Sequence, residues 1–319
     1  MKFKIIAILL AVLLCFCVGC NNENVSSENI SSYVTEISSE NESIISSESV
    51  VESVVSVTES IISIPANNSV QSSPDSPPLV TLSNEKFGFS FGVAKNGQPH
   101  SQSINNQKKF DSLEGVSALA LDTKTPIQEK VLYLTFDCGY EYQGITGQIL
   151  DVLKEKNVKA AFFCTKDYIV KNSNFVNRMI NEGHIVGNHS TTHPVFPDIS
   201  RNKMKTELAG MNDYMKSNYG YSTKYFRFPT GAYSHNALEL VTSCGYKSIF
   251  WSLAYSDWDT GNQKGTQYAF DTVTARLHPG SVMLLHAVSI DNANALPQII
   301  DYAINNGYTF KTLDDYYAK

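Results

Sequence analysis

The chain has 319 residues, of which 42% are hydrophobic and 18% charged, and its formal net charge is −6. This length allows about two domains of the usual ~100–200 residues each. The sequence has no basic stripe interleaved with aromatic residues, which argues against a nucleic-acid partner.

The N-terminus has the pattern of a secretory signal. Lys2 and Lys4 precede a short apolar stretch, IIAILLAVLLCFCVGC. The stretch is somewhat shorter than the ~20 apolar residues of a membrane span. Its end at Cys20 is typical of a bacterial lipoprotein signal, in which the cysteine is lipidated and becomes the new N-terminus. We therefore predict a lipoprotein signal over residues 1–20, lipidation at Cys20 and a lipid-anchored protein outside the cytoplasm; an ordinary signal and an uncleaved anchor are the alternatives.

Residues 21–80 form a Ser-rich acidic segment. They contain 18 serines, nine acidic residues and no Lys or Arg, and Tyr33 is their only aromatic residue. Such a segment has too little apolar bulk to offset the entropy lost on ordering, so we expect a disordered tether. Apart from this segment, Lys2 and Lys4, the chain carries 23 basic and 22 acidic residues, so the folded part is nearly neutral.

From about residue 84 the composition becomes globular. Residues 81–128 contain the strand-like stretch KFGFSFGV and are interrupted by Pro99, and we expect them to be an extension that packs on the following domain. Cys138, Cys164 and Cys244 are the cysteines beyond the predicted signal, and their odd number leaves at least one outside any intrachain disulfide.

Residues 129–319 alternate short apolar runs with helical patterns. The runs, each fitting a buried strand, are 131–136, 160–165, 184–188, 225–228, 247–252, 281–286 and the weaker 308–313. The helical patterns after the first end at glycines that suit a left-handed cap: Gly183, Gly220, Gly245, Gly280 and Gly307. This alternation predicts an α/β domain with a parallel sheet, a distorted (β/α)7 barrel rather than a doubly wound sheet.

Polar residues follow several of these strands. They are Asp137 and Cys138, His189, Arg227, Asp257 and Trp258, and His286. In a barrel of parallel strands the carboxyl ends meet at one face, where catalytic residues gather. We therefore expect these side chains to converge.

Each residue has a plainer alternative when it is taken alone. Asp137 is a catalytic base or a buried acceptor, and Cys138 is a metal ligand or a small buried residue. His189 and His193 have a spacing that allows them to chelate one ion, although this spacing alone favours capping or surface roles.

The joint pattern is more specific than its parts. The stretches TFDCGYE, HSTTH, RFPTG, SDW and LLH resemble the five ordered motifs of the polysaccharide deacetylases, the NodB-type carbohydrate esterases, over about residues 130–312. The stretches WSLAYSDWD, LLHAVSIDNANAL and FGFSFGVAKNGQP are similar to the branch that starts muramic δ-lactam formation in spore cortex peptidoglycan.

The resemblance implies a role for each matching residue. Asp137 would be the general base and His286 the general acid. Arg227 would pair with Asp137, and Asp257 would in turn steady Arg227. Trp258 of SDW and Leu284 of LLH would form the wall of the acetyl pocket, and the backbone N–H of Thr230 would donate to the oxyanion.

The resemblance also implies a divalent metal held by His189 and His193. The family usually has Asp-Asp in its first motif, and the second Asp is a metal ligand. Here that position is Cys138. Either a thiolate completes a Cys-His-His zinc site, or two histidines and water bind the metal. Zn²⁺ is the first candidate.

We therefore expect a membrane-tethered, monomeric peptidoglycan N-deacetylase that acts on N-acetylmuramic acid, en route to muramic δ-lactam, or on N-acetylglucosamine. The alternatives are an O-deacetylase acting on another glycan and a catalytically silent glycan-binding lipoprotein. The joint presence of Asp137, Arg227 and His286 argues against the silent protein, because a binder needs no base and acid together.

Overall fold

The computed structural model describes residues 82–318. The expected signal over 1–20 with Cys20 and the expected tether over 21–80 lie outside the described residues. Within the described part of the chain, every helix is too short or too polar to cross a membrane.

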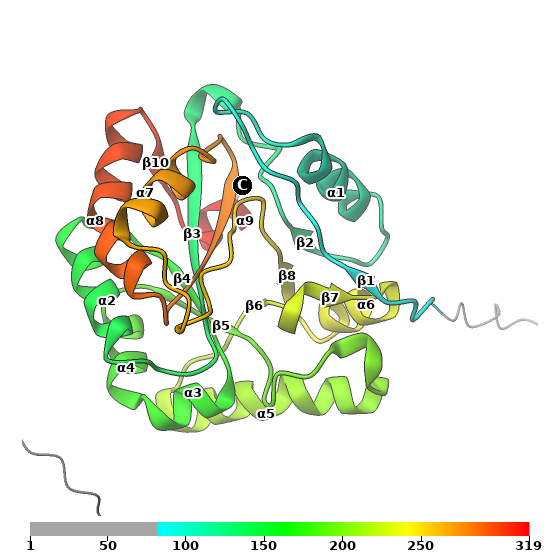
Figure 1. Ribbon diagram of the computed structural model, residues 1–319. Helices are drawn as coiled ribbons and strands as arrows, with labels where there is room; N and C mark the ends of the chain where they lie inside the picture. The colour runs from blue at the N-terminus through cyan, green and yellow to red at the C-terminus, as the bar shows by residue number, and fades with distance from the viewer. Residues whose placement is uncertain (1–81, 319) are drawn as a thin grey trace, which may run out of the picture. The chain divides into compact units, whose positions relative to one another are not determined.

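Within residues 82–318 the main sheet has eight strands (Figure 1). These are β2 (Ala118–Leu119), β3 (Val131–Cys138), β4 (Ala161–Cys164), β5 (Ile185–Asn188), β6 (Tyr225–Phe226), β8 (Lys247–Ile249), β9 (Ser281–His286) and β10 (Thr309–Phe310). The strands pair in parallel in the order β3-β4-β5-β6-β8-β2. On the other side of β3, β9 pairs with nearly all of β3, and β10 pairs with the first two residues of β3. All seven predicted strands are thus present.

The barrel closes through an irregular seam between β8 and β9. Beyond the end of β8, Leu253 forms a single parallel bridge with Met283 of β9. The N–H of Leu284 donates to the carbonyl of Leu253 at 2.8 Å. The short strands and this single bridge make the barrel distorted, as predicted.

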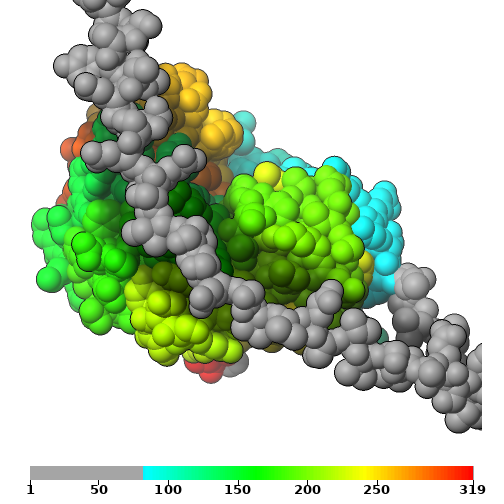
Figure 2. Space-filling view, turned by 90° about the horizontal axis from the view of Figure 1, so that it is seen from below, coloured from blue at the N-terminus to red at the C-terminus, as the bar shows by residue number. Residues whose placement is uncertain are grey.

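Helices surround the sheet (Figure 1). They are α2 (Ile145–Glu155), α3 (Lys166–Lys171), α4 (Ser173–Asn181), α5 (Arg201–Tyr219), α6 (His235–Ser243), α7 (Thr266–Thr274), α8 (Ile290–Asn305) and α9 (Leu313–Tyr317), with the 3₁₀ turns η1 (Ile127–Glu129), η2 (Phe196–Asp198) and η3 (Pro229–Gly231). Figure 2, seen from below, shows much of its face formed by green to yellow-green residues, the colours of α3, α4 and α5.

Four of the five glycines expected after helices take the predicted conformation. Gly183, Gly220, Gly245 and Gly307 follow α4, α5, α6 and α8 with positive φ. The prediction for Gly280 was wrong, because α7 ends at Thr274 and Gly280 forms the turn into β9. Its φ is +77°, and a Cβ there would lie 2.2 Å from the carbonyl oxygen of Asp122.

The residues of β3 are all buried, and they alternate between two sides of the sheet. Leu134, Phe136 and Cys138 belong to the apolar cluster shared with α2 and α8. Val131 and Tyr133 belong to the cluster shared with Phe163, Tyr225 and Ile249, which come from neighbouring strands. The period of two therefore sends Asp137 and Cys138 to opposite sides of the strand.

The segment before η1 packs on the barrel. Its strand β1 (Phe87–Gly88) pairs with β7 (Ala232–Tyr233) in antiparallel fashion, and β2 pairs with β8. Its helix α1 (Ser101–Asp111) buries Phe110 against Tyr233 and Phe250, at ring-centroid distances of 5.7 and 4.9 Å. The extension therefore shares a hydrophobic core with the barrel.

Candidate active site

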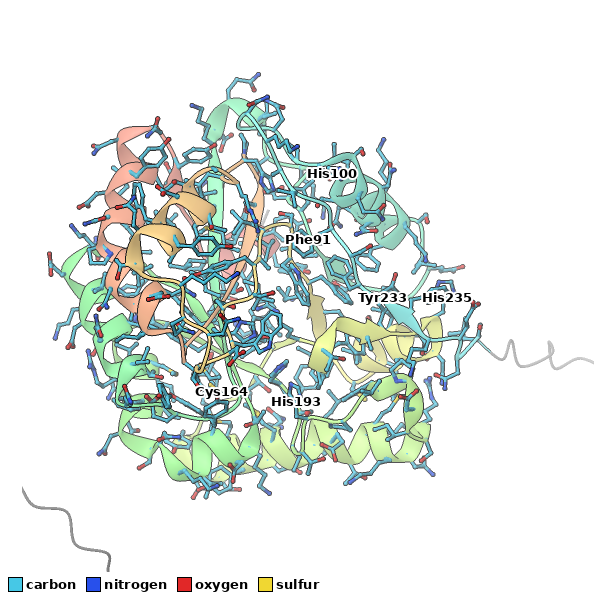
Figure 3. The ribbon with its side chains drawn as sticks, viewed as in Figure 1. Phe91, His100, Cys164, His193, Tyr233 and His235 are labelled. Atoms are coloured by element: carbon cyan, nitrogen blue, oxygen red, sulfur yellow. The ribbon has the colours of Figure 1, made fainter. Side chains whose placement is uncertain are left out.

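A cavity of about 900 Å³ lies where the expected site residues converge. Among its lining residues are seven of those named from the sequence: Asp137, His189, His193, Thr230, Trp258, Leu284 and His286. Arg227, Asp257 and Cys138 lie behind this lining and are buried. Figure 3 labels His193 among the side chains drawn as sticks.

Arg227 anchors the carboxylate of Asp137. Its guanidinium is fully buried and donates to Asp137 Oδ1 at 2.8 Å. It also donates to the carbonyls of Ile249 and Phe250, at 3.1 and 3.3 Å, and lies over the ring of Phe163. Burial by itself would raise the pKa of Asp137, but the charge and hydrogen bond of Arg227, together with the nearby His189 and His286, hold that pKa below its usual value. Asp137 is therefore a carboxylate at neutral pH.

A second carboxylate holds His286. Asp257 Oδ1 lies 2.6 Å from His286 Nδ1, and Asp257 Oδ2 accepts the backbone N–H of His286 at 2.8 Å. Because a carboxylate only accepts, Nδ1 carries the proton. Burial lowers the pKa of His286, but Asp257 outweighs burial and the net shift is upward. The expected support of Arg227 by Asp257 is wrong: Asp257 binds His286 and Asn292, whereas the carboxylate bound by Arg227 is that of Asp137.

His189 and His193 face each other across the same cavity. Their Nε2 atoms are 3.2 Å apart, and His189 Nε2 lies 3.6 Å from Asp137 Oδ2. His189 Nδ1 lies 2.8 Å from the carbonyl of Arg227, which only accepts, so Nδ1 carries the proton and Nε2 keeps its lone pair. Burial lowers the pKa of His189 to about 4, so the ring is neutral at pH 7.

The donor set fits a cation held by the two histidines. Two imidazole nitrogens and a carboxylate oxygen approach one another, and a neutral ring with a fixed tautomer is the form that binds metals. Within residues 82–318 no group of three or more His, Cys, Asp or Glu side chains has metal-binding geometry. Of the described residues, His189 and His193 would be the side chains that hold such a cation.

Cys138 is not part of this set. Its side chain is fully buried in the cluster beside α2, and it pairs in register with Cys164 of β4. Burial and the neighbouring thiol of Cys164 raise its pKa well above the usual value, so it stays a thiol. The structure therefore contradicts the prediction of Cys138 as a metal ligand and agrees with the alternative of a small buried residue.

The remaining sequence-predicted residues line the cavity. Thr230 lies in η3 with φ of +59°, a strained conformation for a residue with a Cβ. Trp258 is half-exposed, and its ring centroid lies 5.7 Å from that of His286. Leu284 precedes His286 by two residues on β9 and therefore points to the same side.

Two polar residues that hold the site are not among those predicted from the sequence. Glu207 on α5 is buried and accepts from the backbone N–H groups of Thr191 and Thr192, at 3.0 and 2.7 Å, which shapes the loop between the histidines. Asn292 on α8 donates to Asp257. A signal existed for Glu207, because it stands three residues after Met204 on the buried stripe of α5.

Comparisons with known proteins identify relatives of this chain. Residues 124–249 match the family described as polysaccharide deacetylase. The chain is 39% identical over 234 residues to the peptidoglycan-N-acetylmuramic acid deacetylase PdaA of Bacillus subtilis, covering 73% of this chain and 86% of that protein. It is 32% identical over 196 residues to a peptidoglycan-N-acetylglucosamine deacetylase of Bacillus cereus, covering 59% and 68%.

Solved structures show the same relationship. The structure of Bacillus subtilis PdaA, a family 4 carbohydrate esterase, matches with a TM-score of 0.68 and 37% identity over 75% of this chain and 100% of that chain. A family 4 carbohydrate esterase from Bacillus anthracis matches with a TM-score of 0.59 and 39% identity over 74% and 98%. The chain therefore belongs to the polysaccharide deacetylases of carbohydrate esterase family 4, which makes it a hydrolase of the amide bonds of N-acetyl groups.

Proposed function

We propose that the chain is a metal-dependent deacetylase of peptidoglycan amino sugars, with N-acetylmuramic acid as the first candidate and N-acetylglucosamine as the second. The observation that carries this proposal is the meeting of two ion pairs, Asp137–Arg227 and His286–Asp257, beside His189. The higher identity and coverage of the relative named for N-acetylmuramic acid support the order of the two substrates.

Asp137 is suited to take the proton of the attacking water. Arg227 binds Oδ1, so Oδ2 is the oxygen that is free to accept a proton on the cavity side. Because the pKa of Asp137 is lowered, the base is ionised at neutral pH and its position is fixed by a buried guanidinium.

His286 is suited to protonate the departing amine. Asp257 holds Nδ1–H, which leaves Nε2 to carry the proton that the sugar amine needs. The raised pKa keeps more of the ring protonated near neutral pH than an unperturbed histidine would be. The base and the acid thus have pKa shifts in opposite directions, each set by its own buried partner.

His189 and His193 would hold the divalent metal, for which zinc is the first candidate, and the metal would acidify water and polarise the acetyl carbonyl. The backbone N–H of Thr230 is the proposed donor to the oxyanion. Trp258 and Leu284 would surround the acetyl methyl group and exclude water from it.

The proposed setting of this reaction is the outer face of the cell membrane. A lipid on Cys20 would anchor a monomer there, and the segment over 21–80 would let the catalytic domain reach the cell wall. A product destined for muramic δ-lactam is the finer proposal, supported by the resemblance to the branch that starts δ-lactam formation.

Acetate release from purified peptidoglycan tests the activity. We expect the intact protein to release acetate and Asp137→Asn to lose at least about 100-fold in rate, the usual contribution of a general base. Mass spectrometry of the digested glycan identifies the deacetylated sugar. Release of O-linked acetate alone would favour an O-deacetylase, and glycan binding without release would favour a silent binder; either result contradicts the proposal.

A further inference from the structure

One wall of the cavity comes from the extension that precedes the barrel. Phe91 lines the cavity and lies in the extension, whereas the match to the family begins at residue 124. Its ring centroid lies 6.4 Å from that of Trp251, which lines the same cavity, and the two rings meet edge to face. Figure 3 labels Phe91 in the chain segment that leads towards α1.

The segment that carries Phe91 is fixed from both sides. On the barrel side, Phe89 packs edge to face on Trp251 at 5.1 Å, and its N–H donates to the carbonyl of Gly231 at 3.2 Å. On the helix side, Ser103 of α1 donates to the carbonyl of Phe91 at 2.6 Å. A wall held in this way needs no ordering when a ligand arrives.

The backbone turn after Phe91 is equally specific. Gly92 has φ of +70°, and a Cβ there would lie 2.0 Å from the ring of His100. Only glycine fits between this ring and the turn. The ring of His100 is itself held at the start of α1, where its Nδ1 accepts the N–H of Gln102 at 3.1 Å.

The chemistry of the wall fits an uncharged sugar ring. A pyranose presents C–H groups on its faces, which pack on aromatic side chains, while its hydroxyl groups stay at the rim in water. The residues that line the cavity include no Lys or Arg, so the part of the described chain that forms this wall has no cation for an anionic group. The volume of about 900 Å³ lies near the upper end of the ~300–1,000 Å³ of ligand pockets and leaves room beyond one acetamido group.

We propose that Phe91 and Trp251 form a binding subsite for a second pyranose ring of the glycan, next to the sugar that loses its acetyl group. This inference rests on the proposed glycan substrate. The extension would thereby make the enzyme prefer a glycan strand over a single sugar.

Kinetics with substrates of two lengths test the subsite. Phe91→Ala, Phe91→Tyr and the control Val93→Ala are compared on peptide-free glycan tetrasaccharide and on a single N-acetylated sugar. Val93 is an exposed residue of the same segment and does not line this cavity. We expect Phe91→Ala to raise the KM for the tetrasaccharide about tenfold, corresponding to about 1.4 kcal/mol, without changing kcat. Phe91→Tyr should restore the KM, and the single sugar should be unaffected.

Equal effects of Phe91→Ala and Val93→Ala would overturn the proposal, as would a loss confined to kcat. Binding provides a readout that does not need turnover. Trp251 and Trp258 are the only tryptophans in the sequence, so quenching of intrinsic fluorescence by the tetrasaccharide reports on this cavity. If the intact protein releases no acetate, the proposed function is wrong, but the subsite can still be tested by binding. An affinity for the tetrasaccharide that is unchanged in Phe91→Ala would overturn the subsite.

Discussion

At the scale of single residues, the proposed base and the proposed acid each contact a buried partner of opposite charge, and the two partners shift the pKa values in opposite directions. Arg227 is fully buried and lowers the pKa of Asp137, whereas Asp257 raises the pKa of His286. The two partners themselves stay away from the cavity lining. The base and the acid can therefore be tested separately by changing the partner and leaving the reacting group intact.

Removal of the charge of Asp257 should move the basic limb of the pH profile. The raised pKa of His286 keeps the acid form to higher pH, and activity falls as pH rises through that pKa. In Asp257→Asn the pKa of His286 falls, so the basic limb of kcat/KM should shift to lower pH while the acidic limb set by Asp137 stays. Initial rates over pH 4 to 10 measure this, and a uniformly lower profile with unmoved limbs would contradict it.

Metal content should distinguish the two histidines from Cys138. Because Cys138 points away from the cavity into the cluster beside α2, Cys138→Ala should keep its metal affinity and lose about 1 kcal/mol of stability from the smaller side chain. His189→Ala should lose tight metal binding, since it removes one of two protein ligands. Equilibrium dialysis against zinc followed by elemental analysis compares the variants; loss of metal from Cys138→Ala would restore the Cys-His-His site.

At the scale of elements, the turn before β9 brings the backbone of Gly280 very close to the backbone of Asp122. Gly280 and Gly245 both have positive φ, at +77° and +87°, but only at Gly280 would a Cβ meet another backbone. Gly245→Ala should cost the ~1–2 kcal/mol of a left-handed residue with a Cβ. Gly280→Ala should cost clearly more, because the turn must also move off Asp122. Urea unfolding of both variants measures the difference in the free energy of unfolding. Equal losses would contradict the prediction, because they would mean that the backbone shifts away from Asp122 at little cost.

The elements that the sequence predicted well are those with local signals. The strand at 131–136 and its six companions are short, apolar and separated by glycine-capped helices, and all seven form part of the sheet. The end of α7 was misplaced because Gly280 has positive φ for a tertiary reason, the contact with Asp122, and not as a helix cap.

The site residues that could be predicted from the sequence are those that stand singly at the end of a strand. Asp137, His189 and His286 converge because parallel strands end at one face. The partner of Asp257 could not be predicted from the sequence, because Arg227 follows β6 and His286 ends β9, and only the packing of the side chains decides which of them Asp257 contacts. The burial of Cys138 away from the site could have been predicted from strand alternation. If Asp137 faces the cavity, the next residue of the strand faces the helices.

At the scale of the whole molecule, the extension and the barrel share one core. Phe110 of α1 packs with Phe250, and β2 adds a strand to β8. Gln107 of α1, itself buried, accepts the backbone N–H groups of Ala120 and Leu121 at 2.7 and 3.2 Å. The matched family range, residues 124–249, leaves out the residues of the extension that make these contacts.

Deletion of the extension should therefore unfold the barrel, whereas deletion of the residues before it should not. A chain that begins at residue 129 exposes the apolar surface over Phe250 and leaves β8 without its edge partner. We expect it to lose cooperative thermal unfolding and to bind a dye specific for exposed apolar surface. A chain that begins at residue 82 keeps every contact described here and is the matched control, expected to unfold in one transition and to release acetate like the full chain. If the chain that begins at residue 129 has the same melting temperature as the control, the extension does not stabilise the barrel and contributes only to substrate binding. The difference in kcat/KM between the two chains would then measure that contribution.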